Sequence, residues 1–81
     1  MDVLYFAWVR ERIGLPMERV ETTAATVQEL VDELIAREER YALAFSDLSA
    51  VRVAIDQELT DMDASLTGAR EVAFFPPMTG G

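Results

Sequence analysis

The segment TVQELVDELIARE, residues 26–38, is the feature that most restricts how this chain can fold. Thr26 and Glu29 have the spacing of a capping box, in which each side chain accepts a hydrogen bond from the other residue's backbone N–H. Apolar residues then recur at the spacing of one helical face: Val27, Leu30, Val31, Leu34 and Ile35. The pattern predicts one amphipathic helix whose apolar face must pack against another element.

The segments before this helix have the composition of β-strands. DVLYFAWV (2–9) is rich in β-branched and aromatic residues, and it predicts a strand that is apolar on both faces. RERIGLP (10–16) predicts a turn, with Gly14 and Pro16 as its typical residues. MERVE (17–21) alternates and predicts a second strand, which forms a hairpin with the first.

The segments after the helix continue this pattern. RYALAFSDL (40–48) predicts a turn or a short helix, and AVRVAID (50–56) alternates like a half-buried strand. QELTDMDASL (57–66) predicts a connection with a short strand around Leu59. REVAFFP (70–76) predicts the last strand, which ends at prolines that have no N–H to donate.

A hairpin, one long helix and further strands favour an α+β fold: a mixed sheet of about five strands packed on one main helix. This is the β-grasp, or ubiquitin-like, arrangement. At 81 residues the chain has room for one core, and its 51% content of hydrophobic residues is enough to form it. We expect a β-grasp domain over residues 1–76 and an extended tail over 77–81.

Composition excludes several classes of function. The chain has no cysteine and no histidine, so it has no disulfide, no thiolate nucleophile and no Ser–His–Asp triad, and it lacks the commonest metal ligand, histidine. We expect no metal site, and we interpret Glu58, Asp61 and Asp63 as a solvated acidic loop. The net charge of −8, with no lysine, repels nucleic acid and anionic lipid and favours a basic protein partner. The N-terminal apolar run is too short for a signal peptide or membrane span, which predicts a cytoplasmic protein.

Two aromatic residues of the first strand and one of the last raise the question of what covers them. In the predicted strands, Phe6, Trp8 and Phe75 lie opposite Tyr5 and Phe74. One helix cannot cover both faces of a sheet, so we predict an exposed apolar patch, and such patches mark partner interfaces.

The last residues, EVAFFPPMTGG (71–81), suggest a projecting tail. Pro76 and Pro77 make its start stiff and extended. Gly80 and Gly81 have no Cβ, so they can pass through a narrow channel that a side chain would block. We therefore interpret the tail as a stiff stem that delivers a terminal carboxylate into another protein's active site.

These motifs resemble those of the small subunits of molybdopterin synthase, a family of ubiquitin-like sulfur carriers. The resemblance covers VLYFAWVRE (3–11), the helix from Thr26, VAIDQEL (53–59) and, most specifically, EVAFFPPMTGG (71–81). Three positions depart from the family pattern: Asp56, Arg70 and Met78.

The resemblance implies a function and a set of partners. A ubiquitin-activating-like adenylyltransferase would use ATP to adenylate the Gly81 carboxylate, and sulfur would then convert it to a thiocarboxylate. The large synthase subunit, joined in a heterotetramer, would receive the tail and transfer the sulfur to cyclic pyranopterin monophosphate, which forms the molybdopterin dithiolene. The chain itself would bind no cofactor and would be a non-catalytic sulfur donor. The catalytic residues would lie on the large subunit.

The resemblance also assigns roles to individual residues. Gly81 would carry the sulfur, and the residues inserted with it would be Gly80, Thr79, Met78 and Pro77. The residues in contact with both partners would be Phe6, Arg10, Leu59 and Phe75.

Three alternatives remain open from the sequence. The chain could carry sulfur for another thio-cofactor such as thiamine, although the FFPP stem speaks against the thiamine type. It could be a ubiquitin-like protein modifier, without chains linked through its own lysines. It could also be a structural β-grasp module with an incidental tail.

Overall fold

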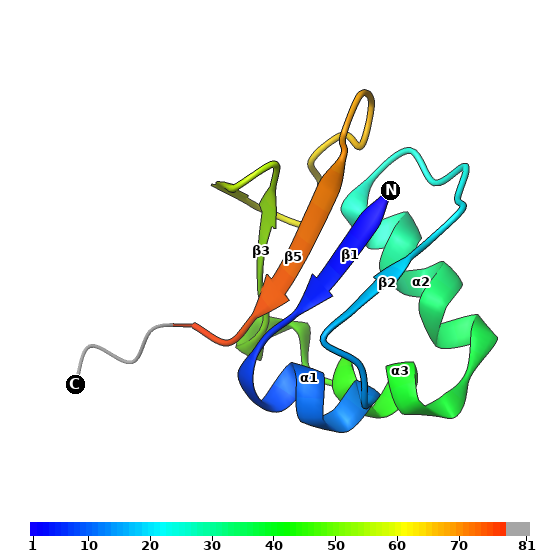
Figure 1. Cartoon of the computed structure of the whole chain (residues 1–81), viewed down its shortest axis with the longest axis vertical. Helices are drawn as coiled ribbons and strands as arrows, with labels where there is room; N and C mark the ends of the chain where they lie inside the picture. Colours follow the sequence, from blue (N-terminus) through cyan, green and yellow to red (C-terminus); the bar gives the residue numbers. More distant parts are fainter. Residues whose placement is uncertain (78–81) are drawn as a thin grey trace.

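A computed structural model describes residues 1–77, and its centre is a five-stranded sheet (Figure 1). The elements in chain order are β1 (Asp2–Tyr5), α1 (Ala7–Ile13), β2 (Met17–Arg19), α2 (Val27–Arg37), α3 (Glu39–Ala44), the 3-10 turn η1 (Leu48–Ala50), β3 (Arg52–Ile55), β4 (Glu58–Thr60) and β5 (Glu71–Phe75). The strand order is β2-β1-β5-β3-β4. Strands β1 and β5 are parallel and the other pairs antiparallel. The predicted α+β fold with a mixed sheet is confirmed.

Helix α2 forms as its sequence predicts. Thr26 is the N-cap residue, and its Oγ1 accepts the backbone N–H of Glu29 at 3.2 Å. The return bond differs from the ideal capping box, because Glu29 Oε1 accepts the N–H of Ala25, at 3.5 Å, instead of that of Thr26. The residues that the helix buries are Val27, Leu30, Val31 and Leu34. These four anchor α2 on the sheet.

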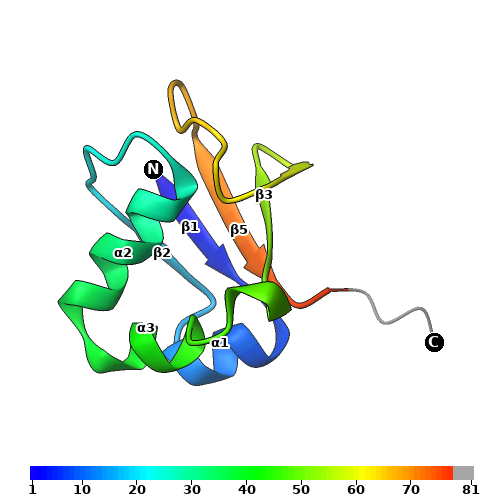
Figure 2. The same ribbon diagram turned by 180° about the vertical axis from the view of Figure 1, so that it is seen from behind.

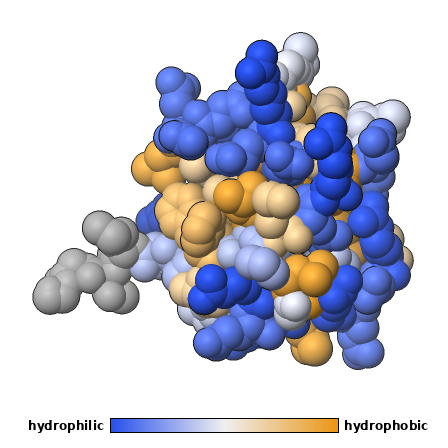
Figure 3. Space-filling view, viewed as in Figure 1, coloured by the Kyte–Doolittle hydropathy of each residue, from blue (hydrophilic) through white to orange (hydrophobic). Residues whose placement is uncertain are grey.

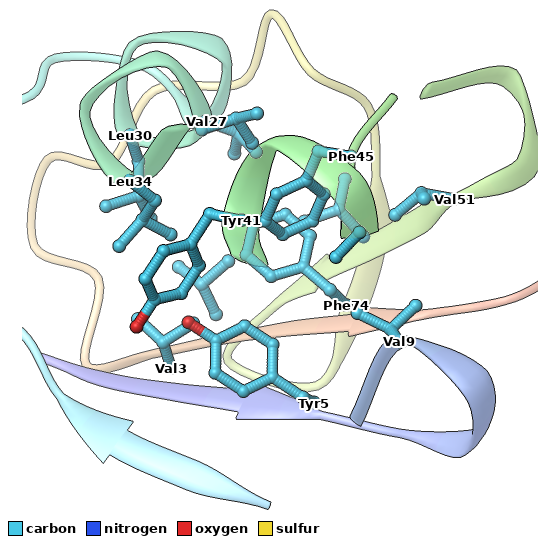
Figure 4. Close-up of a cluster of buried hydrophobic side chains, with 14 of the residues drawn as sticks. Val3, Tyr5, Val9, Val27, Leu30, Leu34, Tyr41, Phe45, Val51 and Phe74 are labelled. Carbon is cyan, nitrogen blue, oxygen red and sulfur yellow. The ribbon is translucent and has the colours of Figure 1, made fainter. Parts of the chain in front are cut away.

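The core fills the space between one face of the sheet and the helices, which lie in front of the sheet in Figure 2. The central strands contribute Val3, Tyr5, Val72 and Phe74, all buried. The Phe74 ring stacks on Tyr5 with centroids 6.2 Å apart and meets the edge of Phe45 at 5.0 Å (Figure 4). This packing fixes the position of β5, the strand that leads to the tail.

The predicted strand over residues 2–9 is wrong beyond Tyr5, and the predicted turn at 10–16 is largely helix α1. Alternation of apolar residues hid a helical spacing, since Val9 and Ile13, four residues apart, are the ones that α1 buries. Gly14 ends the helix in the left-handed region (φ 89°), where its N–H donates to the Arg10 carbonyl at 2.7 Å. Trp8 therefore lies on α1, half-buried, with the Arg12 guanidinium 4.6 Å from its ring centroid.

The other predicted elements are present with shifted boundaries. The short helix expected within 40–48 is α3, and the short strand around Leu59 is β4. Strand β5 ends at Phe75, directly before the two prolines, while the division into a domain of residues 1–76 and a tail of 77–81 stays a prediction. Within residues 1–77, no helix has the length and apolar character needed to cross a membrane.

Candidate functional site

The face of the sheet that points away from the helices carries an apolar row across all five strands. Residues opposite one another in the strand pairs share a face, and the register places one apolar residue of each strand in this row. We call the row the apolar band: Met17, Leu4, Ala73, Ala54 and Leu59. Figure 3, in the view of Figure 1, shows apolar residues gathered over the middle of this face.

The apolar band has large, exposed side chains at its edges and small, buried ones in its centre. Leu59 is 71% exposed and Met17 is 52% exposed, and both lie on edge strands. The central strands contribute Ala73 and Ala54, whose side chains end at Cβ. Ala73 and Ala54 are only 8% and 9% exposed, so the most exposed part of the band lies at its two edges. Such an exposed apolar surface is typical of a protein interface.

Charge divides the two ends of this face. At the start of β5, Glu71 pairs in register with Asp2, and the Asp2 carboxylate forms an ion pair of 3.8 Å with Arg19. At the end of β5, Phe75 lies opposite Arg52 of β3. The end of this face from which the chain leaves the sheet therefore carries the exposed cation Arg52, whereas both signs of charge lie at the other end.

The structure brings the predicted contact residues to that same end. Phe6 is 44% exposed, and its N–H donates to the carbonyl of Phe74 at 3.0 Å, which places it beside the end of β5. Arg10 is exposed on α1, and its N–H donates to the Phe6 carbonyl at 3.4 Å. Phe75 is half-buried at the end of β5. The roles of these residues stay a prediction.

The root of the tail lies in a shallow hollow. Arg52, Leu59, Phe75 and Pro77 line this hollow, whose volume is about 390 Å³. We call it the tail-root hollow. The predicted sulfur carrier Gly81 and the insertion residues Gly80, Thr79 and Met78 lie outside the described residues.

Arg52 and Met17 also belong to this surface, although neither was among the predicted contact residues. Once β2 and β3 are placed, strand alternation puts both on the outer face. Met17 precedes the inward-facing Glu18, and Arg52 precedes the buried Val53. The alternation of Val51, Arg52 and Val53 was a usable signal for Arg52. The register that joins five strands into one row, however, is a property of the assembled sheet.

The described acidic and tyrosine side chains do not form a second exposed cluster of functional groups. No group of three or more acidic side chains within residues 1–77 could hold a metal ion. The two tyrosines are core residues, and burial raises the pKa of both hydroxyls, with their hydrogen bonds to Glu18 adding to the effect.

Residues 3–81 match the model of the ThiS family. The chain belongs to the ThiS family. This match spans nearly the whole chain and includes the tail.

Curated relatives of this ThiS-family chain share one name, "Molybdopterin synthase sulfur carrier subunit". The relative from Escherichia coli K12 is 43% identical over 81 residues, which is 100% of this chain and 99% of the relative. The Haemophilus influenzae relative is 36% identical with the same coverage, and that from Mycobacterium tuberculosis is 35% identical over 83 residues, 96% of its length. The resemblance drawn from the sequence motifs is confirmed.

Solved structures confirm the fold of this ThiS-family chain. SAMP1 from Haloferax volcanii superimposes with a TM-score of 0.74 at 24% identity, covering 100% of this chain and 98% of that one. A putative molybdopterin converting factor, subunit 1, from Pyrococcus furiosus gives a TM-score of 0.70 at 26% identity, with 95% of each chain covered. The ubiquitin-like β-grasp expected from the order of elements is therefore the observed fold.

Proposed function

We propose that this chain is the sulfur carrier subunit of a molybdopterin synthase and that Gly81 carries the sulfur as a thiocarboxylate. The observation that carries the proposal is the full-length match to three relatives of that name, which includes the Gly-Gly end. The name of a subunit implies a large partner subunit. We extend this to a heterotetramer of two small and two large subunits.

The chemistry begins with activation of the Gly81 carboxylate. A free carboxylate is a poor acyl donor, so a ubiquitin-activating-like adenylyltransferase joins it to the AMP part of ATP and releases pyrophosphate. A persulfide sulfur then attacks the carbonyl carbon and AMP leaves. Cleavage of the sulfur–sulfur bond by a thiol leaves the thiocarboxylate.

The second step is transfer of sulfur to cyclic pyranopterin monophosphate on the large subunit. This substrate is a phosphate-bearing anion and the carrier has a net charge of −8, so the cations that bind the phosphate belong to the large subunit. The carrier has no histidine, cysteine or lysine, so the large subunit also supplies the general acid and base. Two transfers build the dithiolene.

The apolar band and the tail root supply the docking surface for this cycle. A partner that covers the band removes exposed Leu59 and Met17 from water and aligns the stem at Pro76 and Pro77 with its own active site. Both partners need the tail, so each uses this face in turn, and we expect the carrier to leave one before it binds the other.

Intact-mass analysis of the C-terminus tests the proposal. After reaction with the adenylyltransferase, ATP and a persulfide donor, the chain is expected to gain about 16 Da, because one oxygen is replaced by sulfur. The matched control lacks Gly81 and is expected to fold normally but to gain no sulfur. The proposal is wrong if this truncated chain still supports molybdopterin formation by the large subunit.

A further inference from the structure

Arg52 borders the apolar band where the chain leaves the sheet, at the end where Arg10 of α1 is also exposed. It is exposed on β3, and its Cα pairs in register with that of Phe75. Its neighbour on the same face of the strand is Ala54, which pairs with Leu59. Arg52 therefore lies among the residues that a partner must cover in order to reach the tail.

No described carboxylate neutralises Arg52. The ion pairs within residues 1–77 join Arg19 to Asp2 and Arg40 to Glu38. Asp61 comes directly after β4, the strand that pairs with β3. Its carboxylate accepts the N–H of Asp63 at 3.1 Å and forms no ion pair with Arg52. Among the described residues, the Arg52 side chain is thus exposed and without an anionic partner.

Docking on the tail-root hollow would change the solvation of this side chain. The hollow combines the Arg52 side chain with three apolar ones, from Leu59, Phe75 and Pro77. A partner that covers these apolar side chains also removes water from the guanidinium. A cation that loses water without gaining an anionic acceptor destabilises a complex strongly, whereas a carboxylate placed there forms a short, bidentate and partly desolvated pair.

We propose that Arg52 pairs with an acidic side chain of the large synthase subunit and thereby fixes how the carrier docks at the root of its tail. This inference rests on the proposed function and adds the chemistry of one contact to it. The large subunit is the partner that the relatives' name implies. Because the carrier has a net charge of −8, most of its surface repels an acidic group of the partner, and an exposed arginine at the tail root favours one docking position over others.

Binding of full-length variants to the purified large subunit tests this contact. Arg52→Gln is expected to raise Kd about tenfold, and Arg52→Glu about a hundredfold. Arg52→Lys keeps the positive charge, so its Kd is expected to rise only about threefold. The matched control is Arg70→Glu, which makes the same charge change at an exposed site before β5, at the other end of the sheet. Its Kd is expected to change less than threefold at moderate salt, because screening weakens distant charges.

A second arm identifies the acidic partner residue. Replacing the responsible Asp or Glu of the large subunit by Arg is expected to restore binding of Arg52→Glu while weakening wild type. If Arg52→Glu and Arg70→Glu weaken binding equally, net charge explains the effect and the inference is overturned. The inference is also overturned if no acidic residue of the large subunit couples to Arg52, or if only binding to the adenylyltransferase weakens.

The wild-type chain separates this inference from the proposed function. If wild type forms the thiocarboxylate and binds the large subunit, the proposed function stands and the Arg52 variants decide the inference alone. If wild type neither gains sulfur nor binds, the proposed function fails, and the inference fails with it. Circular dichroism of each variant confirms that the exposed substitutions leave the fold intact.

Discussion

The Tyr5 hydroxyl on β1 donates a hydrogen bond of 2.7 Å to Oε2 of Glu18 on the neighbouring strand β2. The hydroxyl of Tyr41 on α3 donates to the same oxygen at 2.5 Å. One carboxylate on an edge strand thus satisfies two hydroxyls whose side chains are almost fully buried. Figure 4 shows the two tyrosines with their hydroxyls close together. These are the only two tyrosines of the chain. Their burial, and then their bonds to Glu18, raise the pKa of both hydroxyls above the ordinary value.

We predict from these raised pKa values that the protein loses stability at alkaline pH. The folded chain keeps both phenolic protons at pH values where the unfolded chain releases them, so stability is fully present below about pH 10 and falls as pH rises above it. The free energy of unfolding is expected to fall by up to about 2.7 kcal/mol per pH unit for the two groups together. No lysine titrates in the same range. Urea unfolding across this range measures the slope.

Tyr41→Phe is the control for that slope. This substitution removes one of the two hydroxyls whose pKa is raised. The slope of the free energy of unfolding against pH, above about pH 10, should therefore fall to roughly half. A slope identical to that of wild type would show that the tyrosines are not its source.

Removing the shared acceptor is predicted to destabilise the fold at neutral pH. Glu18→Ala leaves the hydroxyls of Tyr5 and Tyr41 without their carboxylate, and each buried unsatisfied group costs about 1–3 kcal/mol. Glu18→Gln keeps one oxygen acceptor and should lose less. Equal free energies of unfolding for Glu18→Ala and wild type, measured in urea, would contradict the role given to this carboxylate.

Asp56 is predicted to tolerate asparagine but not alanine. It lies in the left-handed region, at φ 49°, and its Oδ1 accepts the N–H groups of both Arg70 and Glu71 at 3.0 Å. Asparagine adopts this conformation readily and keeps the acceptor oxygen, so Asp56→Asn should change the free energy of unfolding by less than about 0.5 kcal/mol. Asp56→Ala loses both bonds and should cost about 2 kcal/mol. Urea unfolding measures the free energy of unfolding of both variants. Equal losses for Asp56→Asn and Asp56→Ala would contradict this account.

Local signals made part of the fold predictable. Helix α2 combines a cap at Thr26 with a continuous apolar stripe, and β5 combines alternation with two prolines that end it. Both signals act within a few residues, so neither depends on the rest of the fold. The position of α1 was not predictable in the same way. Its first turn, with Ala7 at φ 53°, follows a strand whose alternation continues in sequence, and only packing of Val9 and Ile13 in the core favours the helix.

The candidate site was predictable in its parts but not as a surface. Phe6, Leu59 and Phe75 came from strand phase and from the family resemblance. Their assembly with Met17 and Arg52 depends on a strand order that places β5 between β1 and β3. Parallel pairing of the first and last strands joins residues about seventy positions apart, and no local pattern specifies that register.

Leu59 gives the sharpest test of the apolar band as a docking surface. Its side chain is 71% exposed on the edge strand β4, so Leu59→Glu should change the free energy of unfolding by less than about 0.5 kcal/mol. Burial of the Leu59 side chain by a partner would stabilise the complex, and a glutamate there would lose its water instead. The Kd for the large subunit should therefore rise about a hundredfold.

Leu43→Glu is the matched control for Leu59→Glu. Leu43 is 61% exposed, but it lies on α3, on the helical side of the sheet. The same leucine-to-glutamate change there should leave Kd within about threefold of wild type, since it adds one negative charge outside the contact. Calorimetric titration of both variants with the large subunit compares them directly. If both weaken binding equally, the contact does not use the outer face of the sheet, and the helical side becomes the surface to map.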